Sequence, residues 1–154
     1  MKKKLTMILL AFVLCATSLF TVDIKANAQE TGEEVAYESL LTEDSLIGDM
    51  QSQTWGVYLS SGTSIINDAG GGKIGAGGST TAAKKCKVSV IVYVERKVGT
   101  SWVRVTSWTA TNTNALVVST GKTISVASGY YYRVRCTHYA STDSSSSCTS
   151  SLWM

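Results

Sequence analysis

The stretch CKVSVIVYVER, residues 86–96, decides the fold class because its side chains alternate with a period of two. One face of this stretch carries Cys86, Val88, Val90, Val92 and Val94. The other face carries Lys87, Ser89, Ile91, Tyr93 and Glu95. An apolar face against a mixed face is typical of a β-strand that covers a core on one side.

The same period continues on both sides of this strand, in shorter runs separated by turn residues. We predict strands at residues 54–61, 63–67, 101–110, 115–119, 122–128, 129–140 and 148–154. The run DAGGGKIGAGGSTT, residues 68–81, holds six glycines, which permits at most a short edge strand around residues 73–76. With no proline in the chain and no helical pattern beyond residue 52, the sequence predicts one all-β domain over residues 53–154. We expect a β-sandwich of seven or eight antiparallel strands.

The first 28 residues have the pattern of a secretory signal peptide. Three lysines at positions 2–4 precede an apolar run over residues 5–20, and Ala-Asn-Ala at 26–28 supplies a small-residue cleavage site. The apolar run is shorter than the roughly 20 residues that a membrane-spanning helix needs. We therefore expect cleavage after Ala28, secretion, and no integral membrane segment in the mature chain.

Charge is divided sharply along the mature chain. Residues 29–50 hold seven acids and no Lys or Arg, whereas residues 51–154 hold ten bases and three acids. This division predicts an acidic arm at residues 29–52 that is flexible or partly helical, next to a basic domain. A second interpretation is a pro-segment that masks the basic domain.

The stretch GYYYRVRCTHYA, residues 129–140, combines tyrosines, arginines and a cysteine on one predicted strand. Alternation places Tyr130, Tyr132, Val134, Cys136 and His138 on one face and Tyr131, Arg133, Arg135, Thr137 and Tyr139 on the other. Because burying two arginines costs far more than burying tyrosines, the arginine face is the solvent face. One face of this strand therefore packs in the core, and the side chains of the other face are available for binding.

The preceding hairpin extends this face. A four-residue KVGT loop, residues 97–100, pairs Val94 with Val103 and Val92 with Val105. The opposite face then carries Ile91, Tyr93, Trp102, Arg104, Thr106 and Trp108. The two tryptophans either fill the space between two sheets or form an exposed aromatic platform. The candidate binding residues are Tyr131, Arg133, Arg135, Tyr139, Arg104, Trp102 and Trp108.

Three cysteines remain after signal removal, so they cannot all pair within one chain. A turn centred on Thr142 places Cys136 opposite Cys148, which favours a cross-hairpin disulfide. Pairs of Cys86 with either of the others, and three free thiols, remain open.

No pattern for catalysis or cofactor binding is present. His138 is the sole histidine and falls with the inward residues, where a structural role is favoured. Asp68, Glu95 and Asp143 have no spacing typical of paired catalytic carboxylates. No Cys/His spacing predicts a metal site, and GGGKIG at residues 70–75 has no helix after it to bind a phosphate. We therefore expect that the protein is not an enzyme and that it binds no cofactor and no metal.

Two segments carry a resemblance to known families. YVERKVGTSWVRVTSW, residues 93–108, and VASGYYYRVRCTHYA, residues 126–140, resemble strands of immunoglobulin-like and fibronectin type III-like sandwiches. Together with the signal peptide and GVYLSSGTSIIN, residues 56–67, they resemble a family of small secreted proteins of unknown function from Gram-positive, clostridial-type bacteria. The resemblance implies architecture and implies no catalytic residue.

Export, a basic domain and an arginine–aromatic face together predict a secreted, noncatalytic binding module. Its expected partner is an anionic cell-wall polymer, a glycan or a host surface protein, and not a nucleic acid. The alternative is a structural or interaction subunit of a surface assembly, or a precursor masked by its acidic segment.

Overall fold

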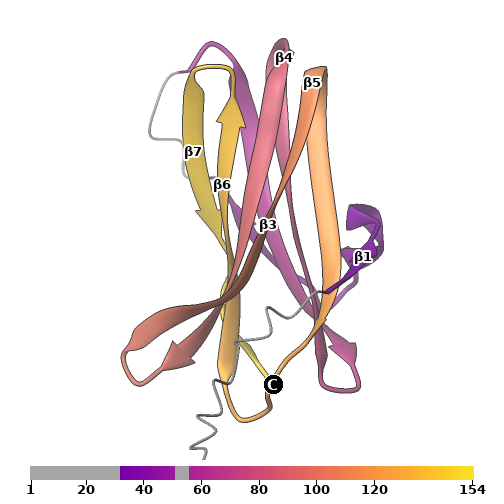
Figure 1. Cartoon of the computed structure of the whole chain (residues 1–154), viewed down its shortest axis with the longest axis vertical. Coiled ribbons are helices and arrows are strands. Elements are labelled where there is room, and N and C mark those ends of the chain that lie inside the picture. The colour runs from indigo at the N-terminus through magenta and orange to yellow at the C-terminus, as the bar shows by residue number, and fades with distance from the viewer. Residues whose placement is uncertain (1–31, 51–55) are drawn as a thin grey trace, which may run out of the picture.

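The computed structural model describes residues 32–50 and 56–154, which form one antiparallel sheet of eight strands (Figure 1). The strands are β1 Glu33–Val35, β2 Leu46–Asp49, β3 Leu59–Gly70, β4 Lys73–Val98, β5 Ser101–Ser125, β6 Tyr131–Ala140, β7 Asp143–Cys148 and β8 Leu152–Trp153. One 3-10 turn, η1 Tyr37–Leu40, lies between β1 and β2. The predicted signal peptide and its cleavage site lie outside the described residues. Within the described part of the chain, no helix has the length and apolar character of a membrane span.

The long hairpin of β4 and β5 forms the centre of the sheet, and β1, β3 and β6 pair with it. The sheet order is β1-β5-β4-β3-β2, and β6 pairs with β4, β7 and β8. The first part of β4 pairs with β3 up to Ala82, and its second part pairs with β6 from Val88 onward. Register shifts in the β4–β5 ladder between residues 81 and 88 mark the change of partner.

The core lies where the alternation of residues 86–96 predicts it. Val88, Val90, Val92 and Val94 are fully buried, and so are Val134 and Cys136 of β6. The first part of β4 also packs against β6 across the core. The Cys136 thiol donates to the carbonyl of Gly77 at 3.6 Å, and a side chain at Gly62 would collide with the His138 ring. The all-β prediction is confirmed in this form.

The predicted strands were too short. Residues 101–110, 115–119 and 122–128 do not form three strands; the single strand β5 runs from Ser101 to Ser125. The chain stays extended through the polar run at 111–114, where Asn114 takes a positive φ of 52° beside an irregularity in the ladder. Residues 59–70 likewise form one strand, β3, in place of the two predicted.

The prediction for the glycine-rich run was wrong in position. Only Gly71 and Gly72 form a turn, and together with Gly70, the last residue of β3, they have φ between 63° and 77°. The residues that follow lie in the middle of the sheet, with β3 on one side and β5 on the other. A Cβ at Gly75 or Gly77 would lie 2.7 or 2.8 Å from the side chain of Leu40. The glycines are therefore needed because another segment packs directly on the strand.

That segment belongs to the acidic arm, which joins the sheet in its described part. β1 pairs with β5 at Gly121–Thr123, and β2 pairs with β3 at Thr63–Ile66. Leu40 is buried on the glycines, and its carbonyl accepts a hydrogen bond from Asn67 Nδ2 at 2.8 Å. Residues 32–50 are therefore part of the sheet and do not form an independent leader that ends at residue 52. The polar composition of this segment concealed Leu40, which is buried, and Leu46, which packs against the core.

Candidate functional site

The candidate site is a row of alternating aromatic, cationic and anionic side chains on the outer face of the sheet. We call it the ladder, and it consists of Trp102, Arg133, Glu95, Arg135 and Tyr93. It forms because β6 pairs with the second half of β4, which sets Arg133 opposite Glu95 and Arg135 opposite Tyr93. β5 adds Trp102 from the other side of β4.

Glu95 is the centre of the ladder. Its Oε2 accepts a hydrogen bond from Nε of Arg133 at 2.8 Å and forms an ion pair with Nη2 of the same arginine, also at 2.8 Å. Its Oε1 accepts a hydrogen bond from Nε of Arg135 at 3.2 Å and forms an ion pair with Nη2 of that arginine, also at 3.2 Å. The Glu95 side chain is 9% exposed and has therefore lost most of its hydration; one charge-assisted pair at each carboxylate oxygen offsets this cost. The two arginines are 27% and 39% exposed, so solvent weakens each pair.

Each guanidinium is also held from a second side by an aromatic ring. The Arg133 guanidinium carbon lies 4.3 Å from the centre of the Trp102 ring, and that of Arg135 lies 4.4 Å from the Tyr93 ring. Such contacts contribute about 0.5–2 kcal/mol each. The arginines are therefore held in fixed orientations, with less rotamer entropy left to lose when they bind a ligand.

The ladder keeps a positive charge and free donors. Two guanidiniums around one carboxylate leave a net charge of +1, and Arg104 adds another from β5, where it pairs with Glu95 in the backbone register. Glu95 engages Nε and Nη2 of each arginine. Among the described residues, Nη1 of each arginine has no hydrogen-bond partner and remains available to an anion.

The remaining predicted residues on β6 lie beyond the two ends of the ladder. Tyr131 is exposed and its ring meets that of Trp153 edge to face, with ring centres 4.8 Å apart. Tyr139 is exposed near the opposite end of β6, where it pairs with Ser89. Both tyrosines are on the solvent side as predicted. Tyr130 was expected in the core but precedes β6 and is exposed, with Arg96 stacked over its ring at 4.5 Å.

Trp108 lies on the other face of the sheet from Trp102. The β4–β5 turn uses only Gly99 and Thr100, and a bulge leaves Val105 without a partner. Because these changes shift the register by an odd number of residues, Trp108 pairs with Val92 and packs against the core. Its indole N–H donates to Thr120 Oγ1 at 3.0 Å. The two tryptophans were predicted to share one environment, and that prediction was wrong.

The predicted Cys136–Cys148 disulfide is absent. Cys86, Cys136 and Cys148 are all free thiols. The β6–β7 turn takes Ser141 and Thr142, which pairs Cys136 with Ser147 and Cys148 with Arg135. This shift of one residue puts Cys148 on the outer face while Cys136 stays in the core.

His138 is fully buried and hydrogen-bonded at both ring nitrogens. Nδ1 lies 2.8 Å from Thr80 Oγ1, and Nε2 lies 2.8 Å from Ser147 Oγ. Since Thr80 Oγ1 donates its own proton to the Ser89 carbonyl, Nδ1 carries the ring proton and Nε2 accepts from Ser147. Burial lowers the pKa of His138 to about 4. The ring is neutral and packed within the core.

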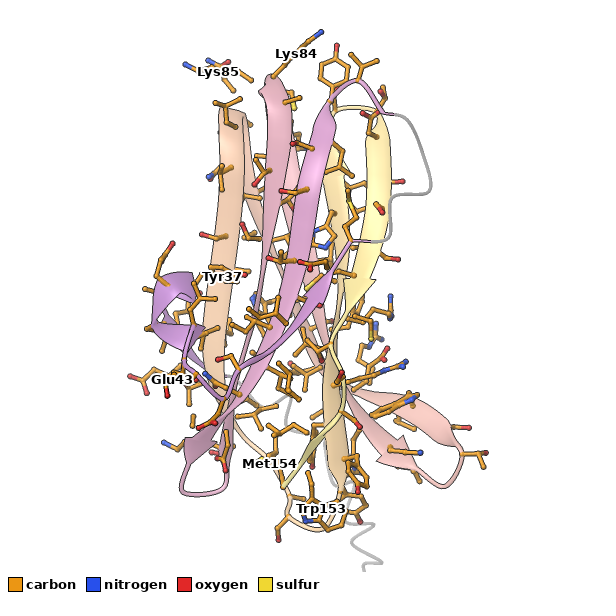
Figure 2. All side chains as sticks on the ribbon, turned by 180° about the vertical axis from the view of Figure 1, so that it is seen from behind. Tyr37, Glu43, Lys84, Lys85, Trp153 and Met154 are labelled. Atoms are coloured by element: carbon orange, nitrogen blue, oxygen red, sulfur yellow. The ribbon has the colours of Figure 1, made fainter. Side chains whose placement is uncertain are left out.

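Sequence reasoning missed Glu95 as a site residue and Trp153 as a surface aromatic. Glu95 was placed on the outer face of its strand, but its pairing with β6 was not predicted. The available signal was that a lone acid faces outward on a strand while two arginines face outward on another. Trp153 was included in a strand predicted at residues 148–154, and that prediction was wrong, since β7 ends at Cys148 and β8 covers only Leu152–Trp153. Two paired residues are too few to show a period. Figure 2 shows Trp153 beside the chain's C-terminal Met154, at the end of the molecule opposite Lys84 and Lys85.

Over the residues that the structure describes, fold and site define an antiparallel β protein of eight strands with an arginine–aromatic outer face. The chain belongs to a family of unknown function, DUF6147, whose model matches residues 25–152. Searches of curated proteins and of solved structures give no match.

Proposed function

We propose that the chain is a secreted, noncatalytic binding module of the bacterial cell surface, from a Gram-positive, clostridial-type organism. Its ladder binds anionic polymers of the cell envelope or acidic extracellular glycans. The proposal includes processing after Ala28 and a sandwich-like closure of the sheet around the core, in the manner of immunoglobulin-like domains.

The observation that carries the proposal is the oriented pair of arginines at Glu95. Guanidiniums bind phosphate and carboxylate groups through paired N–H donors, and their Nη1 groups are free to do so. The flanking rings of Trp102 and Tyr93 add apolar surface against which a sugar can stack. A repeating polyanion meets this row with several groups at once, which raises its apparent affinity.

The acidic segment does not cover the ladder in its described part. β1 pairs with β5 at Gly121–Thr123, and η1 packs on the glycines of β4. Lys122, which lies 3.9 Å from Glu34, is not part of the ladder. The masking hypothesis therefore gains no support from the placement of residues 32–50.

The test is retention on an immobilised poly(glycerol phosphate) and on an acidic glycan, eluted with salt. The triple variant Glu95→Gln, Arg133→Gln, Arg135→Gln removes the ladder charges together, so that no carboxylate is left buried alone. It lowers the net charge by one, and Lys84→Gln lowers it by the same amount at the other end of the molecule. We expect the triple variant to elute at much lower salt and Lys84→Gln to elute like the wild type. Equal elution of the two variants would refute the proposal.

A further inference from the structure

Exposed apolar side chains gather at the end of the molecule that holds the β4–β5 turn. We call this end the apex, and its apolar members are Val98, Val103, Tyr130, Tyr131 and Trp153. Their exposed fractions run from 37% for Tyr130 to 58% for Trp153.

These residues come from different strands and form two groups, one on each face of this end of the sheet. Arg96 stacks on Tyr130 and pairs in register with both Val103 and Tyr132. Tyr131 pairs with Trp153, and their rings touch. In Figure 1 the β4–β5 turn projects sideways from the sheet at the lower left, at the end of the molecule where the C-terminus also lies.

Basic residues lie on the paired parts of β4, β5 and β6 next to the apolar ones. The collar consists of Arg96, Lys97, Arg104, Arg133 and Arg135. Among the described residues, Glu95 is the one acidic side chain within this collar; it is 9% exposed and forms ion pairs with two arginines. The apex therefore presents tyrosine, tryptophan and valine surface next to cationic side chains.

This combination fits an interface between water and lipid. Tyrosine and tryptophan favour the headgroup level of a bilayer, and lysine and arginine are attracted to anionic lipid phosphates. A dissolved polyanion would satisfy the basic collar but would leave Val98 and Val103 in water. We propose that the apex docks on the surface of an anionic lipid bilayer, with the valines and aromatic rings at headgroup depth and the collar on lipid phosphates. This deepens the proposed function and rests on it, because Arg133 and Arg135 serve both.

The test is co-sedimentation of the processed chain, from Gln29 onward, with phosphatidylglycerol–phosphatidylcholine vesicles and with phosphatidylcholine vesicles alone. The decisive variant is Val98→Asp, at a position that is 46% exposed beside the turn. Its matched control is Val117→Asp, which is 45% exposed on β5 where that strand pairs with Thr81, far from the turn. Circular dichroism confirms that each variant is folded, and Trp153→Ser provides a second change at the apex.

We expect binding to the anionic vesicles, with little binding to the neutral ones. Val98→Asp and Trp153→Ser each weaken binding by about tenfold, since each removes apolar contact and the first also adds repulsion. Val117→Asp binds like the wild type.

Two results would overturn the inference. One is vesicle binding that salt abolishes and that Val98→Asp and Val117→Asp change equally, which would be nonspecific adsorption. The other is retention on poly(glycerol phosphate) without any vesicle binding, which would leave the proposed function standing. If the wild type binds the vesicles but is not retained on poly(glycerol phosphate), the proposed function is refuted instead.

Discussion

Protonation of His138 provides a quantitative test of the core, and the perturbation is a fall in pH. The imidazole is fully buried, with Thr80 and Ser147 on its two nitrogens, and its pKa falls from 6.5 to about 4. The unfolded chain therefore takes up a proton below pH 6.5 while the folded chain does not. The stability that this neutral ring contributes is complete above pH 6.5 and is lost as the pH falls toward 4.

The size of the loss follows from the shift. One pKa unit corresponds to about 1.4 kcal/mol, so a fall from 6.5 to about 4 removes about 3 kcal/mol. Against a typical stability of about 5–15 kcal/mol, this is a large fraction. Asp143 affects stability at a lower pH than His138 does. Hydrogen bonds from the backbone N–H groups of Tyr58 and Leu59 lower the pKa of Asp143 from 3.8, so the stability that its carboxylate contributes is lost only as the pH falls below that value.

The assay is urea denaturation at a series of pH values between neutral and about 4, followed by tryptophan fluorescence and far-ultraviolet circular dichroism. The control is His138→Gln, whose amide can hydrogen-bond to both hydroxyls but does not titrate. We expect the wild type to lose about 1.4 kcal/mol per pH unit across this window and the variant to lose much less. Parallel pH dependences in the two proteins would refute the burial of a neutral His138.

Three further predictions test the packing, the thiols and the ladder. Leu40→Ala removes the side chain that packs on the glycines and lowers the free energy of unfolding by about 2–5 kcal/mol, whereas the exposed neighbour Leu41→Ala changes it by less than about 0.5 kcal/mol in thermal unfolding. In a native thiol-labelling experiment read by mass spectrometry, exposed Cys148 reacts and buried Cys136 reacts only after unfolding; an intramolecular disulfide in the native protein would contradict this. Glu95→Gln alone leaves two arginines without their shared carboxylate, so it lowers stability by about 1–2 kcal/mol more than joint replacement of the three charged ladder residues; the reverse order in urea denaturation would show that the ion pairs contribute little.

Strand faces were predictable wherever a run of alternation was long. Val88, Val90, Val92 and Val94 lie in the core, and the arginines of β6 face outward, because burial imposes a period of two on the sequence itself. The predicted pairings failed because register depends on turns and bulges of one residue. Gly99 and Thr100 alone form the turn after β4, and the unpaired Val105 then reverses the face of every residue beyond it.

Long-range partners were the least predictable feature. The glycine-rich run indicated at most a short edge strand, but it forms a central strand, and Leu40, far away in sequence, packs on Gly75 and Gly77. The ladder depends on the same kind of information. Arg133, Arg135 and Trp102 could be selected as surface residues, but their convergence on Glu95 needed β6 to pair with β4 and not only with β7.

The most direct test of the binding surface is nuclear magnetic resonance of arginine side chains during titration with poly(glycerol phosphate). The Nε–H signals of Arg133 and Arg135 are protected by Glu95, and they report on their own guanidiniums. If the ladder is the binding surface, these two signals shift first and saturate together. Shifts confined to backbone signals of Lys84 and Lys85, at the far end of the molecule, would contradict it.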